Sequence, residues 1–239
     1  MSHERGAGPA RLPVAVMAKV PVAGEVKTRL CPPLTPTQAA GLARCFLQDR
    51  MEQIAGIELA EPILAFTPPE REAEIRALVG PATGVRLVPQ VGGDLGARLD
   101  RLLTDLLAAP PGAAIAVDAD SPTLPTAFVR DACLALLGDT ADVVVGPCED
   151  GGYYLIGLRR PTPALFRAIA WSTPAVLEET VARARQLGLR LRLLPAWFDV
   201  DRGEDLARLR ARAPVGAGAR VAAPFEPRRT LRFLEAERL

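Results

Sequence analysis

The sequence predicts an α/β protein in which a mostly parallel sheet is covered by helices on both faces. Short apolar segments alternate along the chain with longer segments whose apolar residues recur at helical spacing. The early apolar segments are continuous, as in strands that are buried on both faces. Apolar residues make up 49% of the 239 residues, which is enough for a large core. These observations together predict a three-layer α/β/α sandwich.

The predicted elements follow one another without a long linker. Thr35 is expected to cap the first helix, with Pro36 in its first position, and Gly80 is expected to end the second helix. The expected strands are 12–18, 61–67, 85–90, 113–120, 141–147, 153–158 and 189–195. The expected helices are 35–55, 68–80, 94–108, 125–138, 162–170, 173–188 and 203–212.

These elements predict a single domain over residues 1–213. Residues 214–239 are rich in Ala, Gly, Pro and Arg, and the prolines Pro214, Pro224 and Pro227 interrupt any long helix. Apart from a last helical turn within 230–239, this segment is expected to be a loose C-terminal tail that the core does not need.

The composition argues against several classes of function. Lysine and arginine (29) nearly balance aspartate and glutamate (28), so no nucleic-acid surface is expected. No apolar segment approaches the roughly 20 residues that cross a bilayer, and the N-terminus lacks an apolar signal segment. The single histidine, His3, argues against a zinc site and against Ser-His-Asp or Cys-His catalysis. The four cysteines show no CxxC spacing and predict reduced thiols in a cytoplasmic protein.

The segment after the first predicted strand holds both lysines of the chain. Lys19 and Lys27 lie eight residues apart, with Gly24 between them and Arg29 close behind. Ligands of open α/β sheets bind beyond the carboxyl ends of the strands, which is where this loop falls. We interpret it as a phosphate-binding loop, in which lysine acts as a point charge and arginine as a bidentate donor. The alternative is a solvated loop with ordinary surface charges.

Carboxylates follow the fourth predicted strand. Asp118 and Asp120 are separated by one residue, so in an extended chain they point to the same face. Two carboxylates suit Mg²⁺ or Mn²⁺, which bind oxygen ligands and keep positions open for phosphate oxygens. We therefore expect a metal or a nucleotide there. The alternative is an Asx turn or a helix cap before Pro122.

Two later segments carry further acids. Glu149 and Asp150 precede two glycines, and we expect one of these acids to face the pocket, although a tight hairpin turn would also explain the pattern. Asp199 and Asp201 share a face, and a carboxylate from this pair would complete a metal site with Asp120. Their alternative role is to cap the helix that follows.

Glycines surround the start of the third predicted helix. Gly92, Gly93 and Gly96 are expected to form a turn that contacts a nucleotide. Their spacing does not match GxGxxG, and the sequence has no GxxxxGK[ST] segment, so dinucleotide binding and P-loop chemistry are disfavoured.

Six motifs, in order over about residues 12–210, resemble the bacterial glycosyltransferase-like proteins of the nucleotide-diphospho-sugar transferase superfamily. They are MAKVPVAGEVKTRLCPPLT, QVGGDLGARL, DADSPTLP, GPCEDGGYYLIGL, WSTPAVL and FDVDRGEDL. Related enzymes include the guanylyltransferase of coenzyme F420 synthesis and the molybdenum-cofactor nucleotidyltransferases. The resemblance implies a GT-A type fold, a nucleotide-bound donor and a divalent metal. It places the nucleotide near Lys19, Lys27, Arg29 and Gln90, and the metal near Asp120.

The first functional hypothesis is a metal-dependent glycosyltransferase that uses a nucleotide sugar as donor. Mg²⁺ or Mn²⁺ held by Asp118, Asp120 and Asp201 would neutralise the diphosphate leaving group. Lys27 and Arg29 would share that role, and Lys19 is expected to hold the same phosphates.

The remaining site residues are expected to serve the two substrates. Glu149 or Asp150 would orient or deprotonate an acceptor hydroxyl. Gln90, Gly93 and Asp118 are expected to contact the nucleotide. The acceptor is a small molecule whose identity the sequence does not reveal, and a homodimer is compatible with the sequence.

Two other hypotheses stay open. In the second, the protein is a nucleotidyltransferase that joins an NTP to a phosphorylated or phosphonate-type substrate, with Lys27 and Arg29 on the β,γ-phosphates and pyrophosphate as the leaving group. In the third, it binds nucleotide without catalysis. Release of a nucleoside diphosphate distinguishes the first hypothesis from the second, and turnover of any kind excludes the third.

Overall fold

The computed structural model describes residues 11–80, 85–211 and 222–239. Within these ranges the chain forms one seven-stranded sheet with the order β3-β2-β1-β4-β6-β5-β7. Only β6 runs antiparallel to its neighbours β4 and β5, so the predicted mostly parallel sheet is confirmed. The strands are β1 Leu12–Lys19, β2 Ala60–Thr67, β3 Arg86–Pro89, β4 Ala114–Asp118, β5 Val143–Pro147, β6 Tyr153–Leu158 and β7 Leu191–Leu193.

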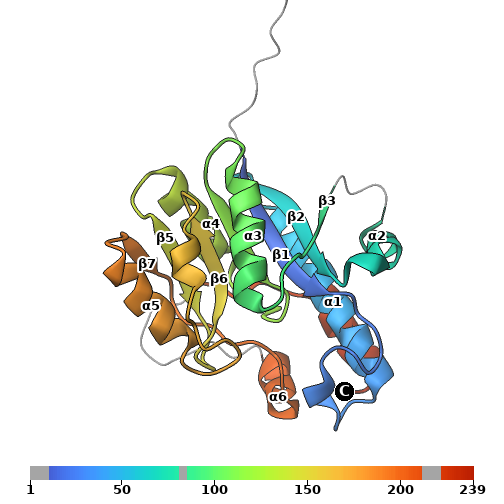
Figure 1. Cartoon of the computed structure of the whole chain (residues 1–239). Coiled ribbons are helices and arrows are strands. Elements are labelled where there is room, and N and C mark those ends of the chain that lie inside the picture. Colours follow the sequence, from blue (N-terminus) through green and yellow to red (C-terminus); the bar gives the residue numbers. More distant parts are fainter. Residues whose placement is uncertain (1–10, 81–84, 212–221) are drawn as a thin grey trace, which may run out of the picture.

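Helices cover both faces of the sheet (Figure 1). They are α1 Pro36–Ala55, α2 Glu72–Val79, α3 Leu95–Leu107, α4 Thr126–Leu137, α5 Val176–Gln186, α6 Gly203–Ala211 and α7 Arg228–Ala236. Successive residues of β1 alternate between two cores: Val14 and Val16 pack with α1 and α4, whereas Ala15 packs with α3. This alternation on a continuously apolar strand is what a strand buried on both faces requires. The predicted α/β/α sandwich is therefore present.

Local sequence signals account for where the helices begin. The Thr35 side chain accepts a hydrogen bond from the Gln38 amide, and the Gln38 side chain caps Thr35 in return, which forms the expected start of α1. Asp94 caps α3 by accepting from the Ala97 amide at 2.7 Å. The helix predicted over 162–170 is only a short 3-10 turn, Pro163–Phe166. It stops because Arg167 is extended, with φ −86° and ψ 142°.

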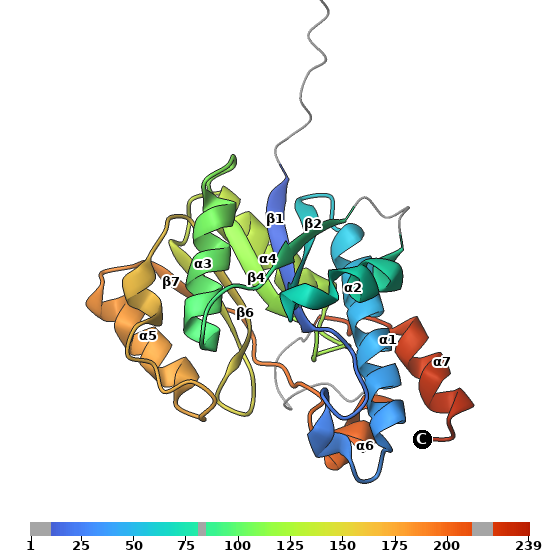
Figure 2. The same ribbon diagram turned by 45° about the vertical axis from the view of Figure 1, so that its right-hand side comes forward.

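The C-terminal segment departs from the expected loose tail. Residues 228–236 form α7, which lies beside α1 (Figure 2) and buries Leu234. The Asp49 carboxylate of α1 accepts hydrogen bonds from the Arg229 and Thr230 amides, at 3.1 and 2.8 Å, and so caps α7 from another helix. The Phe225 amide donates to the Thr123 carbonyl oxygen. Residues 212–221 lie outside the described part, so the domain boundary at residue 213 stays a prediction.

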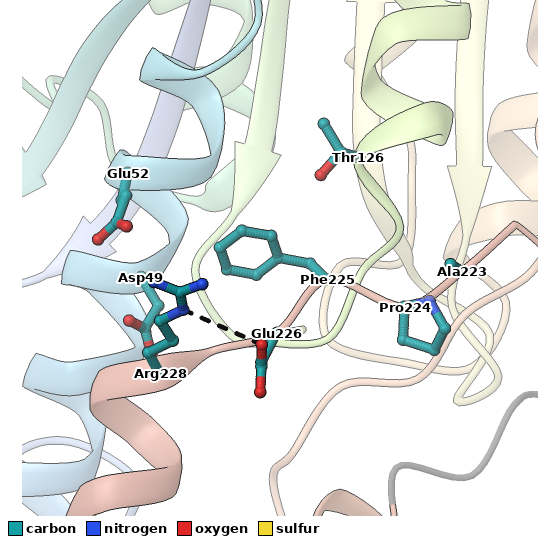
Figure 3. A pocket seen from close by; sticks show the side chains of 8 residues that line it. All are labelled: Asp49, Glu52, Thr126, Ala223, Pro224, Phe225, Glu226 and Arg228. Atoms are coloured by element: carbon teal, nitrogen blue, oxygen red, sulfur yellow. Dashed lines mark ion pairs between the residues drawn. The ribbon is translucent and has the colours of Figure 1, made fainter.

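A hollow of about 370 Å³ lies between α1, the start of α4 and the segment that leads into α7 (Figure 3). Phe225 and an ion pair between Arg228 and Glu226 form its outer side. None of the predicted site residues lines this hollow. Among the helices of the described ranges, none is long and apolar enough to span a membrane.

Candidate functional site

A cavity of about 680 Å³ opens at the carboxyl ends of β4 and β5 and next to the segment before α6. Eight carboxylates line it: Asp118, Asp120, Glu149, Asp150, Asp199, Asp201, Glu204 and Asp205. Three arginines also line it, Arg29, Arg202 and Arg208, together with several apolar and aromatic side chains. The topology therefore collects the acids of three segments that are distant in the sequence, as the position of their strand ends predicts.

Lys27 lies at the centre of an ion-pair cluster. Its side chain is only 5% exposed, and its Nζ lies 2.8 Å from Asp120 Oδ1, 3.0 Å from Asp201 Oδ1 and 2.8 Å from the Val200 carbonyl oxygen. Burial alone would lower the pKa of Lys27, but the charges of Asp120 and Asp201 outweigh this effect and raise it. The ammonium therefore stays charged and ties the loop after β1 to two distant carboxylates. Lys27 itself has a positive φ of 50°, which marks a tight turn.

The other two cations of the predicted phosphate loop lie differently. The Arg29 side chain is 69% exposed, lines the cavity and pairs with Asp201 Oδ2 at 3.2 Å. Lys19 is exposed and is not among the residues lining the cavity, and its Nζ donates to the Glu25 carbonyl oxygen at 2.8 Å. The structure thus brings Lys27 and Arg29 together with the acids and leaves Lys19 at the outside of the loop.

Asp118 and Asp120 both line the cavity, but in different settings. Asp118 accepts from Ser121 Oγ at 2.7 Å and lies 3.5 Å from Arg50 Nη2. Burial raises the pKa of Asp118 to about 6, although the charge of Arg50 opposes the rise. Asp120 pairs with Lys27, and its carbonyl oxygen accepts from the Val200 amide at 2.8 Å. This backbone bond joins the end of β4 to the segment that carries Asp199 and Asp201.

Sequence reasoning missed Arg50. The guanidinium of this α1 residue is buried and donates to the carbonyl oxygens of Asp118 and Ser121, as well as to Gln53. Gln53 in turn donates to the Leu124 carbonyl oxygen at 2.5 Å. The available signal was a charge on an apolar stripe, because Arg50 lies four residues after Phe46 and four before Ile54, both fully buried.

Asp199 belongs to the pair from which the sequence predicted a third carboxylate, and it lies close to Asp150 and Cys148. Three atoms that could bind a metal lie within 4.8 Å of one another: the Cys148 sulfur and one carboxylate oxygen each of Asp150 and Asp199. Burial, followed by the negative charges of Asp150, Asp118 and Asp201, raises the pKa of Asp199 to about 7. In the described ranges no cationic side chain lies within 4 Å of its carboxylate. Negative charge is therefore concentrated here without a direct protein counter-ion.

The Glu149–Asp150 segment is both a hairpin turn and a wall of the cavity. It connects β5 to the antiparallel strand β6. Glu149 forms a two-pronged ion pair with Arg208, whose hydrogen bonds lower the pKa of this glutamate. Asp150 accepts from the Gly152 amide at 2.9 Å and has no cationic partner within the described part. Of the two predicted bases, only Asp150 has a carboxylate free for a ligand.

The two residues predicted to contact a nucleotide after β3 do not line this cavity. Gln90 is buried, and its side-chain amide donates to the carbonyl oxygens of Ala18 and Ala65, at 3.2 and 2.8 Å, across the ends of β1 and β2. Gly93 lies in the turn before α3, with no atom within 4 Å of where a Cβ would stand. Their contact with a nucleotide stays a prediction.

Part of the cavity lining is an aromatic wall. This wall consists of Trp171, Tyr153 and Leu95. The rings of Trp171 and Tyr153 meet edge to face, with centroids 6.5 Å apart. A Cβ on Gly96 of α3 would overlap the Trp171 indole, so this glycine is what allows the indole to lie against the helix.

Comparison with known proteins assigns the chain to a family. A family model described as "Uncharacterized protein conserved in bacteria (DUF2064)" matches residues 50–173, more than half of the 239 residues. The chain belongs to the DUF2064 family. No curated protein matches this DUF2064 chain.

Solved structures share the fold of this DUF2064 chain. The crystal structure of a candidate nucleotide-diphospho-sugar transferase from Desulfovibrio desulfuricans G20 has a TM-score of 0.81 and 29% identity, with 94% of this chain and 95% of that chain covered. A 4-diphosphocytidyl-2C-methyl-D-erythritol synthase has a TM-score of 0.54 and 14% identity over 84% of this chain and 99% of its own. A nucleotidyl transferase from Methanothermobacter thermautotroptrophicus has a TM-score of 0.53 and 18% identity, covering 85% and 98%. The predicted fold and the predicted superfamily are confirmed.

Proposed function

We propose that this DUF2064 protein is a metal-dependent transferase with a nucleotide-activated donor, and that the donor is a nucleotide-diphospho-sugar. One observation carries the proposal: four aspartates line the same cavity beyond the strand ends of the sheet, Asp118, Asp120, Asp199 and Asp201. A protein with the same fold and 29% identity is named as a candidate nucleotide-diphospho-sugar transferase. Ligand sites of open α/β sheets occur at this edge.

The carboxylates fit a hard divalent cation. Mg²⁺ and Mn²⁺ prefer carboxylate oxygens, and Asp199 brings negative charge that no nearby cation of the described chain balances. We propose that Asp199 joins the predicted ligands Asp118, Asp120 and Asp201. A divalent ion held there would supply positive charge to the diphosphate of the donor.

Lys27 and Arg29 would have different tasks. Because the Lys27 ammonium is already surrounded by Asp120, Asp201 and the Val200 carbonyl oxygen, we infer that it mainly holds these two carboxylates in place. Arg29 is exposed at the cavity with one contact to Asp201, so its guanidinium has donors left for phosphate oxygens.

Asp150 is the group we assign to the acceptor. A general base needs an ionised carboxylate within reach of the hydroxyl proton. Glu149 is ill suited, because Arg208 occupies both of its oxygens. Asp150 lines the cavity, and one of its oxygens accepts from the Gly152 amide, whereas the other accepts from no donor of the described residues. It would therefore orient the acceptor hydroxyl and take its proton.

Nucleotidyl transfer is the second candidate. The solved structures with the same fold include a protein named a nucleotidyl transferase and a synthetase in complex with CTP, at 18% and 15% identity. Since both reactions use a nucleotide and an acid-rich strand edge, the leaving group distinguishes them: a nucleoside diphosphate in glycosyl transfer and pyrophosphate in nucleotidyl transfer.

Calorimetric titration of nucleoside diphosphates and NTPs, with and without Mn²⁺, tests metal-dependent binding. We expect Mn²⁺ to strengthen binding at least about tenfold in the wild type, which is a difference of about 1.4 kcal/mol. Asp120→Ala should lose this metal dependence. Asp105→Ala removes an exposed acid of α3 that pairs with Arg101 one turn away and lies outside the cavity, and it should bind like the wild type. Unchanged metal dependence in Asp120→Ala would contradict the proposal.

A further inference from the structure

The cavity combines an aromatic wall with a carboxylate, that of Asp150, which has no ion-pair partner among the described residues. Trp171, Tyr153 and Leu95 line the cavity, and so does the Asp150 carboxylate. The aromatic faces offer contact to the C–H face of a ring, and ionised carboxylates accept hydrogen bonds from hydroxyl groups. A cavity lined by both kinds of side chain suits a ligand that is apolar on its faces and carries hydroxyl groups around its edge.

The walls are held in place before any ligand arrives. The Leu177 amide donates to the Gly151 carbonyl oxygen at 2.9 Å, which joins the turn after β5 to the segment that carries Trp171. Gly151 has φ 90° and lies so close to Pro174 that a Cβ would overlap the Pro174 backbone. Gly96 and Tyr153 fix the position of the Trp171 ring. A preorganised pocket loses less entropy when a ligand binds.

The charge of the cavity restricts the ligand further. The lining holds eight carboxylates against three arginines. Even when the charges of Lys27, Arg50 and a bound divalent cation are added, eight negative charges face seven positive ones if every group is ionised. Arg208 is already held by both oxygens of Glu149, and Arg29 is the arginine assigned above to the phosphates of the donor. A phosphate on the acceptor would therefore meet like charge, which disfavours a wrong partner strongly.

We propose that the acceptor of this protein is an uncharged hydroxylated ring, such as a sugar or cyclitol, which packs on Trp171 while Asp150 binds its hydroxyls, and that phosphorylated acceptors are excluded. This inference rests on the proposed function, because it concerns the second substrate of the same site.

The test is the binding of methyl α-glucoside, methyl α-mannoside, methyl α-galactoside and myo-inositol, each compared with a monophosphate of the same ring, in excess Mg²⁺. Calorimetry gives the affinities. Tryptophan fluorescence gives the location, since the chain has two tryptophans and Trp197 is fully buried. We expect at least one neutral ring to bind about tenfold or more tightly than its phosphate and to change the fluorescence, and we expect Trp171→Phe to lose that change.

Two variants probe the aromatic wall, and a third serves as the control. Trp171→Ala should weaken binding of the neutral ring roughly threefold to tenfold. Gly96→Ala keeps the indole but displaces it, and it should weaken binding in the same direction. Leu134→Ala removes an exposed apolar side chain of α4 outside the cavity and should bind like the wild type.

Three results would overturn the proposal: a phosphate that binds as tightly as its neutral ring, no fluorescence or heat signal with any neutral ring, or unchanged affinity in both wall variants. Ring binding is measured without donor. Its failure therefore leaves the nucleotide titrations untouched, and failure of those titrations leaves the ring measurement valid.

Discussion

The substitution Arg50→Met should show how much a single buried arginine at the end of β4 contributes to the free energy of unfolding. The substitution keeps an unbranched stem in the core but removes the donors to the Asp118 and Ser121 carbonyl oxygens and the charge 3.5 Å from the Asp118 carboxylate. Removing one partner of a buried ion pair typically costs about 3–5 kcal/mol. We expect about 3 kcal/mol here, because Asp118 can take up a proton and so recover part of the loss.

The loss should depend on pH. The pKa of Asp118, about 6 in the native protein, already lies above its unfolded value of about 4, so ionisation of this group costs stability as the pH rises through that window. Without Arg50 the pKa of Asp118 rises further. The variant should therefore lose more stability at pH 8, where the unfolded carboxylate is ionised and the native one resists ionisation, than at pH 5.

Urea unfolding at both pH values measures the effect, and thermal unfolding should show a drop of about 6–12 °C at pH 8 for a chain of this size. Arg44→Met, on the exposed side of the same helix, is the matched control and should change stability by less than about 0.5 kcal/mol. A loss below about 1 kcal/mol in Arg50→Met, or an equal loss at both pH values, would refute this reasoning.

Three further substitutions have defined outcomes. Lys27→Arg should weaken metal-dependent nucleotide binding several-fold in calorimetry, because a guanidinium is too large for the buried position 2.8 Å from Asp120; wild-type affinity would contradict this role. In chelator-treated protein, Asp199→Asn should raise the melting temperature more at pH 8 than at pH 5, since the pKa of Asp199, about 7, exceeds its unfolded value of about 4 and its ionisation costs stability over that window; an equal rise at both pH values would show the carboxylate to be unperturbed. Asp49→Ala should cost about 1–2 kcal/mol in urea unfolding by uncapping α7, and a loss under about 0.5 kcal/mol would restore the loose-tail interpretation.

The elements of the fold could be predicted because their signals are local. Continuous apolar segments gave the positions of the strands, and Thr35 with Pro36 gave the start of α1. The edge of the sheet that carries the site was also predictable, since the acids follow the strands at their carboxyl ends. Asp118, Asp120 and Asp150 all reach the cavity that this rule anticipates.

Partners that are distant in the sequence could not be predicted. Lys27 was expected to face phosphate, but its ammonium lies between Asp120 and Asp201, and the second of these is 174 residues away. Nothing in the loop sequence indicates which acid will meet it. The same limit hid α7, whose cap is Asp49 on another helix, 181 residues before Thr230.

The buried polar residues show a different limit. Arg50 interrupts an apolar stripe of α1, which signals that something polar must lie opposite, but the stripe does not reveal that this partner is the end of β4. Nothing in the sequence around Trp171 indicates that its indole lines the cavity. Only the overlap of a Gly96 Cβ with its ring shows how it comes to line a cavity.

Product identification tests the central claim most directly. The protein is incubated with each common nucleotide sugar and each NTP, together with Mg²⁺ or Mn²⁺ and the neutral rings named above, and the released nucleotide is separated from pyrophosphate by chromatography. We expect metal-dependent release of a nucleoside diphosphate from one nucleotide sugar, abolished in Asp120→Ala and retained in Asp105→Ala. Release of pyrophosphate from an NTP would contradict glycosyl transfer in favour of nucleotidyl transfer, and the absence of any nucleotide product from the whole panel would contradict the proposed transferase.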